Sequence, residues 1–271
     1  MQTSYLIYKS AKIHYSRFGK GNRLLIGLHG FADDGSLFGV LQNSLSTQYT
    51  VYALDLPFHG KTKWPTRHFN EKDLIGIIAL IQERERKPRI DLMGYSMGGR
   101  MVQKILFELI PIVDQIFLIA PDGLNTHRIF DINATPRPIQ RAMHWLVQKP
   151  QWLIWIIKKA YQWRFITKFI HDFTYYHIST KEKRIRIFNT WRSLEAFTFS
   201  QQALMDLLRQ HPTVSVIMVF GTRDEVIPPD TGTLFEQTLD NVQVYLIEEG
   251  HLLIDEKLNT LLTEIQIKTP H

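Results

Sequence analysis

The chain has 271 residues, enough for one large domain or for one domain that carries an insertion. It has no cysteine, which excludes disulfides, thiolate metal sites and a cysteine nucleophile. The formal net charge is +6, which would favour nucleic acid only if the charge formed a coherent patch. The first residues alternate like a strand rather than a signal peptide, and no apolar run is long enough to span a membrane, so we expect a cytoplasmic protein.

Short apolar segments alternate with helical patterns before residue 124 and again after residue 200. The predicted strands are 3–8, 11–18, 24–28, 50–54, 89–93, 114–120, 214–220 and 242–247. Helical spacing covers 36–45, 71–86, 99–109, 230–239 and 252–266. Strands that alternate with helices indicate parallel pairing, so residues 1–123 and 201–271 are predicted to form an α/β core with a doubly wound, mostly parallel sheet. Residues 124–200 interrupt this core with a helical, strongly aromatic segment.

A glycine-flanked serine follows the strand predicted over 89–93, in the segment Gly94-Tyr95-Ser96-Met97-Gly98. A strand that turns through G-x-S-x-G into a helix lifts the serine hydroxyl clear of the sheet, a geometry called the nucleophile elbow. A side chain at either outer glycine would collide with the neighbouring strand or helix, and the serine would have a strained backbone. The pattern predicts Ser96 as a nucleophile, with a simple helix-capping role as the alternative.

A serine hydroxyl needs a base within hydrogen-bond reach, and the base needs an acid that orients it. Asp224 follows the strand 214–220 and His251 follows the strand 242–247, so both are expected at the carboxyl edge of the sheet. The order Ser, Asp, His along the chain is the order that accompanies a nucleophile elbow. Asp122, after the strand 114–120, and Glu225 are rival candidates for the acid.

Acyl transfer also needs N–H donors for the oxyanion that develops in the transition state. One donor is expected from the residue after the nucleophile, Met97, and the other from the loop after the strand 24–28. In that loop Gly30 would let the backbone turn inward, which makes Phe31 the second candidate donor. Asp33 and Asp34 come next, and we expect them to cap the following helix rather than to touch substrate.

Several segments together resemble the α/β-hydrolase fold superfamily. They are Gly94-Tyr95-Ser96-Met97-Gly98-Gly99, His29-Gly30-Phe31, Asp55-Leu56-Pro57-Phe58-His59-Gly60, the run from Gly221 to Pro228, and Gly250-His251. The resemblance covers almost the whole chain outside 124–200. It implies an eight-stranded sheet, a triad of Ser96, Asp224 and His251, and neither a cofactor nor a metal. Members of the superfamily usually have D-x-P-G-H-G at the Asp55 loop; here Phe58 replaces the first of those glycines, which we expect to affect substrate shape more than activity.

The 124–200 insert resembles a helical cap over the active site of such enzymes. It holds five of the six tryptophans and has 13 lysines and arginines against four carboxylates, a net charge of +9. The tryptophans are Trp145, Trp152, Trp155, Trp163 and Trp191. The aromatic residues could line an apolar acyl pocket, the basic helices could touch an anionic membrane surface, or the charge could attract an acidic substrate. No nucleic-acid-binding module is recognised.

The sequence as a whole predicts a serine hydrolase that cleaves carboxylic esters through a covalent acyl-enzyme. The expected substrate is a small ester with an apolar acyl part. Two alternatives stay open: hydrolysis of a carbon–carbon bond in a diketone by the same triad, and a non-catalytic member that only binds a ligand.

Overall fold

A computed structural model describes residues 1–66, 68–124 and 150–265 of the chain. The chain divides into two compact units, one of Met1–Thr126 with Ala196–His271 and the other of His127–Glu195. We call them the sheet unit and the helical unit, and each is described by itself. Among the described residues, no helix is both long enough and apolar enough to cross a membrane.

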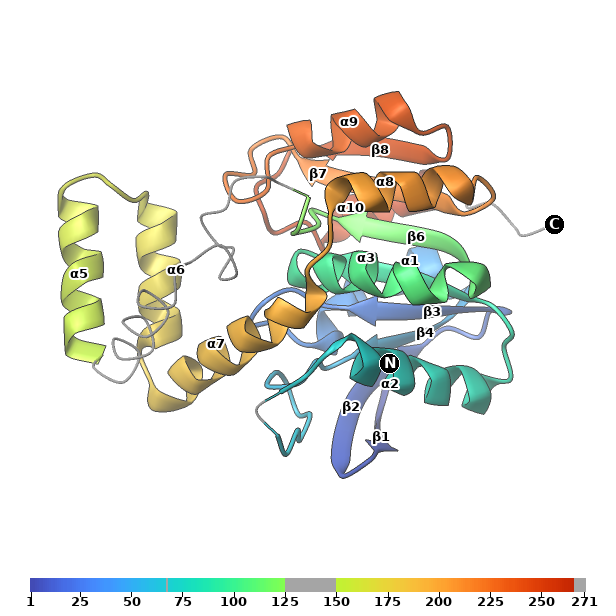
Figure 1. Cartoon of the computed structure of the whole chain (residues 1–271), viewed down its shortest axis with the longest axis horizontal. Helices are drawn as coiled ribbons and strands as arrows, with labels where there is room; N and C mark the ends of the chain where they lie inside the picture. Colours follow the sequence, from blue (N-terminus) through green and yellow to red (C-terminus); the bar gives the residue numbers. More distant parts are fainter. Residues whose placement is uncertain (67, 125–149, 266–271) are drawn as a thin grey trace. The chain divides into compact units, whose positions relative to one another are not determined.

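The sheet unit is built on eight strands in the order β1-β2-β4-β3-β5-β6-β7-β8 (Figure 1). The strands β1 and β2 form an antiparallel hairpin, β2 pairs antiparallel with β4, and every other neighbour is parallel. This topology confirms the predicted doubly wound, mostly parallel sheet. The strands are β1 Gln2–Tyr8, β2 Ala11–Phe18, β3 Arg23–Leu28, β4 Tyr49–Leu54, β5 Ile90–Tyr95, β6 Val113–Ile119, β7 Ser215–Gly221 and β8 Val242–Ile247.

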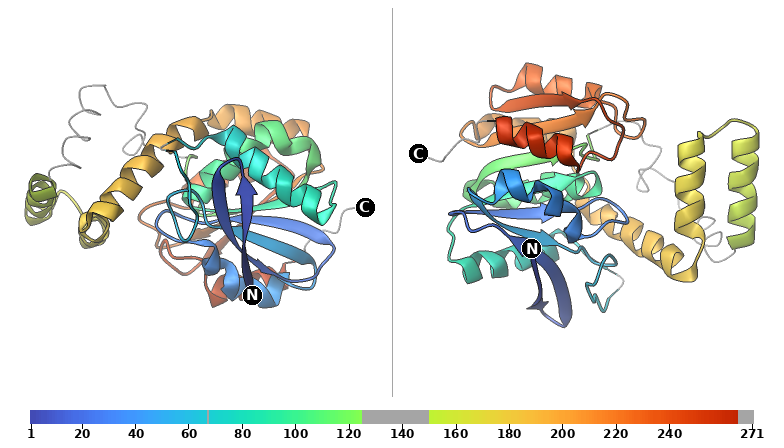
Figure 2. Two further views of the ribbon diagram at one scale, coloured as in Figure 1. Left: turned by 90° about the horizontal axis from the view of Figure 1, so that it is seen from below. Right: turned by 180° about the vertical axis from the view of Figure 1, so that it is seen from behind.

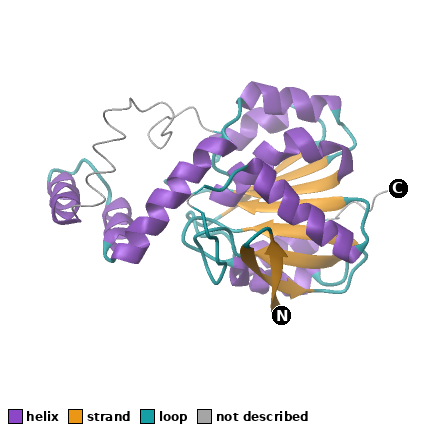
Figure 3. Cartoon of the chain, turned by 60° about the horizontal axis from the view of Figure 1, so that its bottom comes forward, coloured by secondary structure: helices purple, strands orange, loops and turns teal. Residues whose placement is uncertain are grey.

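Helices cover both faces of this sheet (Figure 3). On one face α3 packs against α2 and α8, and on the other α1 packs against α10, which is red in the rear view of Figure 2. The helices of the sheet unit are α1 Gln42–Leu45, α2 Glu71–Glu85, α3 Met97–Leu109, α8 Gln201–Gln210, α9 Asp230–Thr238 and α10 Glu256–Glu264. Short 3₁₀ turns add η1 Gly35–Leu41, η2 Ile110–Ile112 and η5 Glu195–Phe197, the last of which crosses the boundary between the units.

The strands of the sheet centre are the continuous apolar runs of the sequence. Every residue of β4 and β5 is buried, because helices cover both faces of a parallel sheet. The parallel registers keep the carboxyl ends of the strands in step, with Leu28 opposite Gly94 and Gly221 opposite Ile247. The loops that follow β3, β5, β6, β7 and β8 therefore leave the sheet at one edge. These loops carry Phe31, Ser96, Asp122, Asp224 and His251.

Two predicted helices differ from the observed ones. The helix expected over 36–45 is a 3₁₀ turn followed by one turn of α-helix, and Asp34 caps it by accepting a hydrogen bond from the Ser36 N–H at 2.9 Å, as predicted. The last helix starts at Glu256 instead of 252, because the Asp255 carboxylate accepts from the N–H groups of Lys257 and Leu258 and so fixes the N-terminus there.

The helical unit contains α5 Pro150–Gln162, α6 Lys168–Ile178 and α7 Lys181–Leu194. Helix α6 packs against both α5 and α7, and Figure 1 shows α5 and α6 side by side. The side chain of Thr180 caps α7 by accepting from the Lys183 N–H. The role of the insert as a cap over a reaction site stays a prediction. Outside the described residues lie Trp145 and the basic residues Arg128, Arg137, Arg141 and Lys149.

Candidate active site

Ser96 occupies the sharp turn between β5 and α3. Its backbone has φ +48° and ψ −114°, a combination that is sterically costly for a residue with a side chain. Hydrogen bonds hold the turn: the Ser96 N–H donates to the carbonyl of Ile119 at 2.9 Å, and the Asp122 N–H donates to the carbonyl of Ser96 at 3.0 Å. The strained conformation is therefore held by Ile119, the last residue of the neighbouring strand β6, and by Asp122 in the loop after it.

The glycines around Ser96 are required by close backbone contacts. A Cβ atom on Gly94 would lie 2.6 Å from the carbonyl oxygen of Gly98 in α3. A Cβ on Gly98 would lie 2.0 Å from the carbonyl oxygen of Leu28 at the end of β3. Neither distance is possible without moving backbone, so the predicted collisions with the neighbouring helix and strand are confirmed.

The structure brings together Ser96, His251 and Asp224, which lie on three separate loops. Nε2 of His251 is 3.0 Å from Oγ of Ser96, and Nδ1 of His251 is 2.7 Å from Oδ2 of Asp224. The Asp224 side chain is fully buried and the His251 side chain is 15% exposed. With a carboxylate acceptor beside Nδ1, that nitrogen carries the imidazole proton, and Nε2 is left to accept a hydrogen bond from the serine hydroxyl.

Asp224 is held by the turn that follows β7. Its Oδ1 atom accepts hydrogen bonds from the N–H groups of Val226 at 2.8 Å and Ile227 at 2.9 Å. These bonds orient the carboxylate so that its other oxygen faces His251. Because the donors are backbone groups of the same turn, the local sequence itself fixes the direction of this side chain.

The two rival acids are placed differently. Asp122 forms an ion pair with Arg100, with Oδ2 2.9 Å from Nε, and accepts from the Gly123 N–H at 2.7 Å. Glu225 is exposed, and it directly follows Asp224, the residue that contacts His251. Among the three candidate acids, all in the described part of the chain, Asp224 is the one within hydrogen-bond distance of the histidine.

The loop after β3 is fixed by a buried histidine. The Leu56 N–H donates to Nε2 of His29 at 3.0 Å, so Nδ1 carries the proton and donates to the Gly30 carbonyl at 2.6 Å. Burial lowers the pKa of His29, which keeps the imidazole neutral as this pair of bonds requires. A Cβ on Gly30 would lie 2.9 Å from the Tyr95 ring, so glycine is needed here for close packing. Phe31 follows directly on this fixed loop.

Met97 is the first residue of α3. The first N–H groups of an α-helix have no acceptor within the helix, and they carry the positive end of its dipole. The Met97 N–H is thus a donor beside the serine. The role of Met97 and Phe31 as oxyanion donors stays a proposal.

Sequence reasoning missed a contact that ties the elbow to the histidine loop. The Tyr95 hydroxyl donates to the main-chain carbonyl of His251 at 2.8 Å, and their rings lie 5.6 Å apart. Tyr95 directly precedes the nucleophile, and its side chain is buried. The variable position of the G-x-S-x-G pattern gives no signal for such a contact.

The Asp55 loop supports the neighbouring turns. Its carboxylate accepts from the Gly35 N–H at 2.9 Å and the Lys61 N–H at 2.7 Å, and it lies 2.7 Å from Nδ1 of His14. Phe58, which replaces the usual glycine, has φ +71°, in the left-handed region where glycine is favoured. Phe58 therefore has a backbone conformation that glycine adopts without strain, and it adds an aromatic side chain to the loop.

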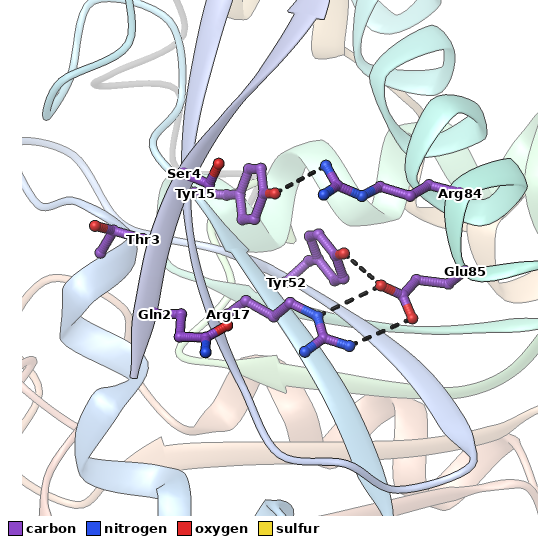
Figure 4. A pocket seen from close by; sticks show the side chains of 8 residues that line it. All are labelled: Gln2, Thr3, Ser4, Tyr15, Arg17, Tyr52, Arg84 and Glu85. Carbon is purple, nitrogen blue, oxygen red and sulfur yellow. Dashed lines mark hydrogen bonds and ion pairs between the residues drawn. The ribbon is translucent and has the colours of Figure 1, made fainter.

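A separate pocket of about 570 Å³ lies between β1, β2, β4 and the end of α2 (Figure 4). Its polar groups bond to one another: Tyr52 donates to Glu85 at 2.5 Å, Arg17 pairs with Glu85, and Arg84 donates to the Tyr15 hydroxyl. None of these four elements carries Ser96, Asp224 or His251. Within the described ranges, we find no group of three or more histidine or acidic side chains arranged for a metal ion.

Several curated proteins are similar to this chain. The hydrolase YugF of Bacillus subtilis, itself uncharacterized, is 22% identical over 253 residues, which are 90% of this chain and 89% of the relative. Other curated relatives match over a shorter part. One is the dihydrolipoyllysine-residue acetyltransferase component of an acetoin cleaving system in Cupriavidus necator, of which the match covers 30%.

Solved structures share the fold at low identity. A thermophilic esterase from Thermogutta terrifontis superposes with a TM-score of 0.66 at 14% identity, covering 97% of this chain and 96% of that one. A meta-cleavage product hydrolase from Pseudomonas fluorescens gives a TM-score of 0.65 at 18% identity, with 96% of both chains covered. The sequence model of the alpha/beta hydrolase family matches residues 25–257, from β3 into α10. The chain therefore belongs to the alpha/beta hydrolase family.

Proposed function

We propose that this chain is a serine hydrolase that cleaves carboxylic esters with a triad of Ser96, Asp224 and His251. The observation that carries the proposal is the continuous chain of contacts from Oγ of Ser96, through the imidazole of His251, to the carboxylate of Asp224. A hydroxyl, a neutral imidazole and a carboxylate in this order are the parts that nucleophilic acyl transfer requires.

In the first step Oγ of Ser96 attacks the ester carbonyl carbon, and its proton moves to Nε2 of His251. The carboxylate of Asp224 stabilises the imidazolium that forms. The carbonyl oxygen becomes an oxyanion, and the N–H groups of Met97 and Phe31 are proposed to bind it. When the tetrahedral intermediate collapses, the C–O bond to the leaving group breaks, and the alcohol departs with the proton from Nε2.

In the second step water takes the place of the alcohol. His251 removes a proton from the water, and the resulting hydroxide attacks the acyl carbon on Ser96. Collapse of this intermediate breaks the acyl–Oγ bond, and the serine recovers its proton from Nε2. The products are the carboxylic acid and the free enzyme, and the sequence of steps consumes one water.

Ester cleavage is also supported by the comparisons, because a hydrolase matches along most of the chain and an esterase shares the fold. We propose a substrate with an apolar acyl part, on the strength of the aromatic residues of the 124–200 insert. The meta-cleavage product hydrolase shows that the fold also accommodates other bonds, so the test below includes a carbon–carbon substrate.

The proposal is tested with p-nitrophenyl esters of increasing acyl length, a dienone-type diketone, and a fluorophosphonate that labels activated serines. We expect ester turnover, labelling at Ser96, and a loss of at least about 10⁴-fold in kcat for Ser96→Ala. Preferential cleavage of the diketone would shift the assignment to carbon–carbon hydrolysis. Folded protein that is neither labelled nor active would identify a non-catalytic member of the family.

A further inference from the structure

The helical unit exposes a row of large apolar side chains on α5 and at the residue that directly follows it. Trp152, Trp155, Ile156 and Trp163 are 55%, 54%, 41% and 66% exposed, and we call these four residues the α5 face. Phe165, just after the helix, is 76% exposed, and its ring lies 6.1 Å from that of Trp163. Soluble proteins rarely expose contiguous apolar surface without a partner for it.

The α5 face points away from the packing of its own unit. Positions 152, 155 and 156 have the i, i+3, i+4 spacing of one helix side, so they share one side of α5, and Trp163 directly follows the last residue of the helix. Ile157, which projects from another side, is buried, and Tyr161 contacts His171 of α6 with ring centroids 4.5 Å apart. Helix α5 thus contacts α6 with one side and presents tryptophans on the other, the reverse of an ordinary surface helix.

The charge around this face is strongly positive. Residues 150–195 hold nine lysines and arginines against three carboxylates. The net charge of this segment is therefore +6, which equals the net charge of the whole chain. Four of the cations lie on α5, in the turn after it, or at the start of α6: Lys158, Lys159, Arg164 and Lys168. Lys168 is paired with Asp172 at 2.5 Å, the one carboxylate between residues 150 and 180.

We propose that the α5 face binds the surface of an anionic lipid bilayer. Tryptophan favours the headgroup level, where its ring is in apolar surroundings and its N–H stays polar, and lysine and arginine beside it attract anionic headgroups. Protein interfaces are enriched in tryptophan and arginine but depleted in lysine, and three of these four cations are lysines, which favours a lipid surface over a protein partner. Helix α5 has 13 residues, which suits a helix lying along the interface.

The test is cosedimentation of the full chain with vesicles. We expect binding to vesicles of equal parts phosphatidylglycerol and phosphatidylcholine, weak binding to pure phosphatidylcholine, and weaker binding at high salt. The triple variant W152S/W155S/W163S should lose at least about tenfold in vesicle affinity. The matched control, Tyr5→Ser with Ile7→Ser, removes exposed apolar residues of β1 in the sheet unit and should bind as wild type does.

A second measurement does not depend on the fold of any variant. In the unaltered protein, brominated lipids in the anionic vesicles should quench tryptophan fluorescence, because bromine quenches indoles that reach the interface. Absence of both binding and quenching would overturn the proposal. So would a tryptophan-dependent dimer, seen by light scattering, that does not bind vesicles, since the face would then contact a second copy of the chain.

Discussion

Two histidines, one in each unit, have opposite surroundings. His251 of the sheet unit faces a carboxylate, with Nδ1 2.7 Å from Asp224. His177 of the helical unit faces cations, with Nδ1 3.4 Å from Nη2 of Arg186. Burial, together with the charges of Arg186 and Lys183, lowers the pKa of His177 to about 4.

The contrast shows that burial of an imidazole does not by itself make a base. Proton transfer to the imidazole during catalysis forms a charged imidazolium, and a nearby carboxylate stabilises that charge. The cations around His177 oppose the same charge. The sequence has 11 histidines, so it is the surroundings that separate a candidate base from a structural side chain.

The largest expected effect comes from removing each histidine in turn. His251→Ala should lower kcat/KM for an ester by about 10⁴-fold or more, because the serine loses its base. His177→Ala, measured at neutral pH on folded protein, should change kcat/KM less than tenfold. Steady-state kinetics of both variants measures this difference. A similar loss of kcat/KM in the two variants would contradict the assignment of His251 as the base.

The next effect concerns the acids rather than the bases. Asp224→Asn should lower kcat by about 10³- to 10⁴-fold, because the amide can donate to Nδ1 and so favour the wrong tautomer of His251. Asp122→Asn removes a carboxylate that pairs with Arg100, and activity should fall only a few-fold. If Asp122→Asn proved the more damaging change in kcat at equal thermal stability, Asp224 would not be the orienting acid.

The smallest expected effect is on the free energy of unfolding at acidic pH, and it comes from His177 in the helical unit. The pKa of His177, about 4, lies below the unfolded value near 6.5, so the unfolded chain binds the proton more tightly. The contribution of neutral His177 to the free energy of unfolding is therefore complete above pH 6.5 and is lost as the pH falls toward 4. Between pH 7 and 5 the wild type should lose up to about 2 kcal/mol more than His177→Asn, as measured by denaturant unfolding at each pH. Parallel pH curves would show that the pKa of His177 is the same in the folded and the unfolded protein.

Much of the sheet unit was predictable because its signals are local. Continuous apolar runs mark buried parallel strands, and a glycine-flanked serine after such a run marks the elbow. His251 and Asp224 were placed at the correct edge of the sheet simply because each follows a strand. The parallel topology then brings these residues close together, because parallel strands end at the same edge of the sheet.

Other features depend on contacts that sequence spacing does not show. The choice between Asp224 and Asp122 depends on Arg100, which lies four residues beyond the serine on α3 and draws Asp122 into an ion pair. The hydrogen bonds of buried His29 likewise join two loops that are far apart in the sequence. The tryptophans of α5 were visible as composition, but their outward direction could be seen only in the folded unit.

The hydrogen bond from the Tyr95 hydroxyl to the His251 carbonyl has a consequence for how the site responds to motion. It crosslinks two points that are 156 residues apart along the chain, one adjacent to the nucleophile and the other on the base itself. Thermal displacement of the last loop is then shared by the strand that precedes the serine. We therefore expect Oγ of Ser96 and Nε2 of His251 to move together, so that the distance between them varies less than it would if each loop moved alone.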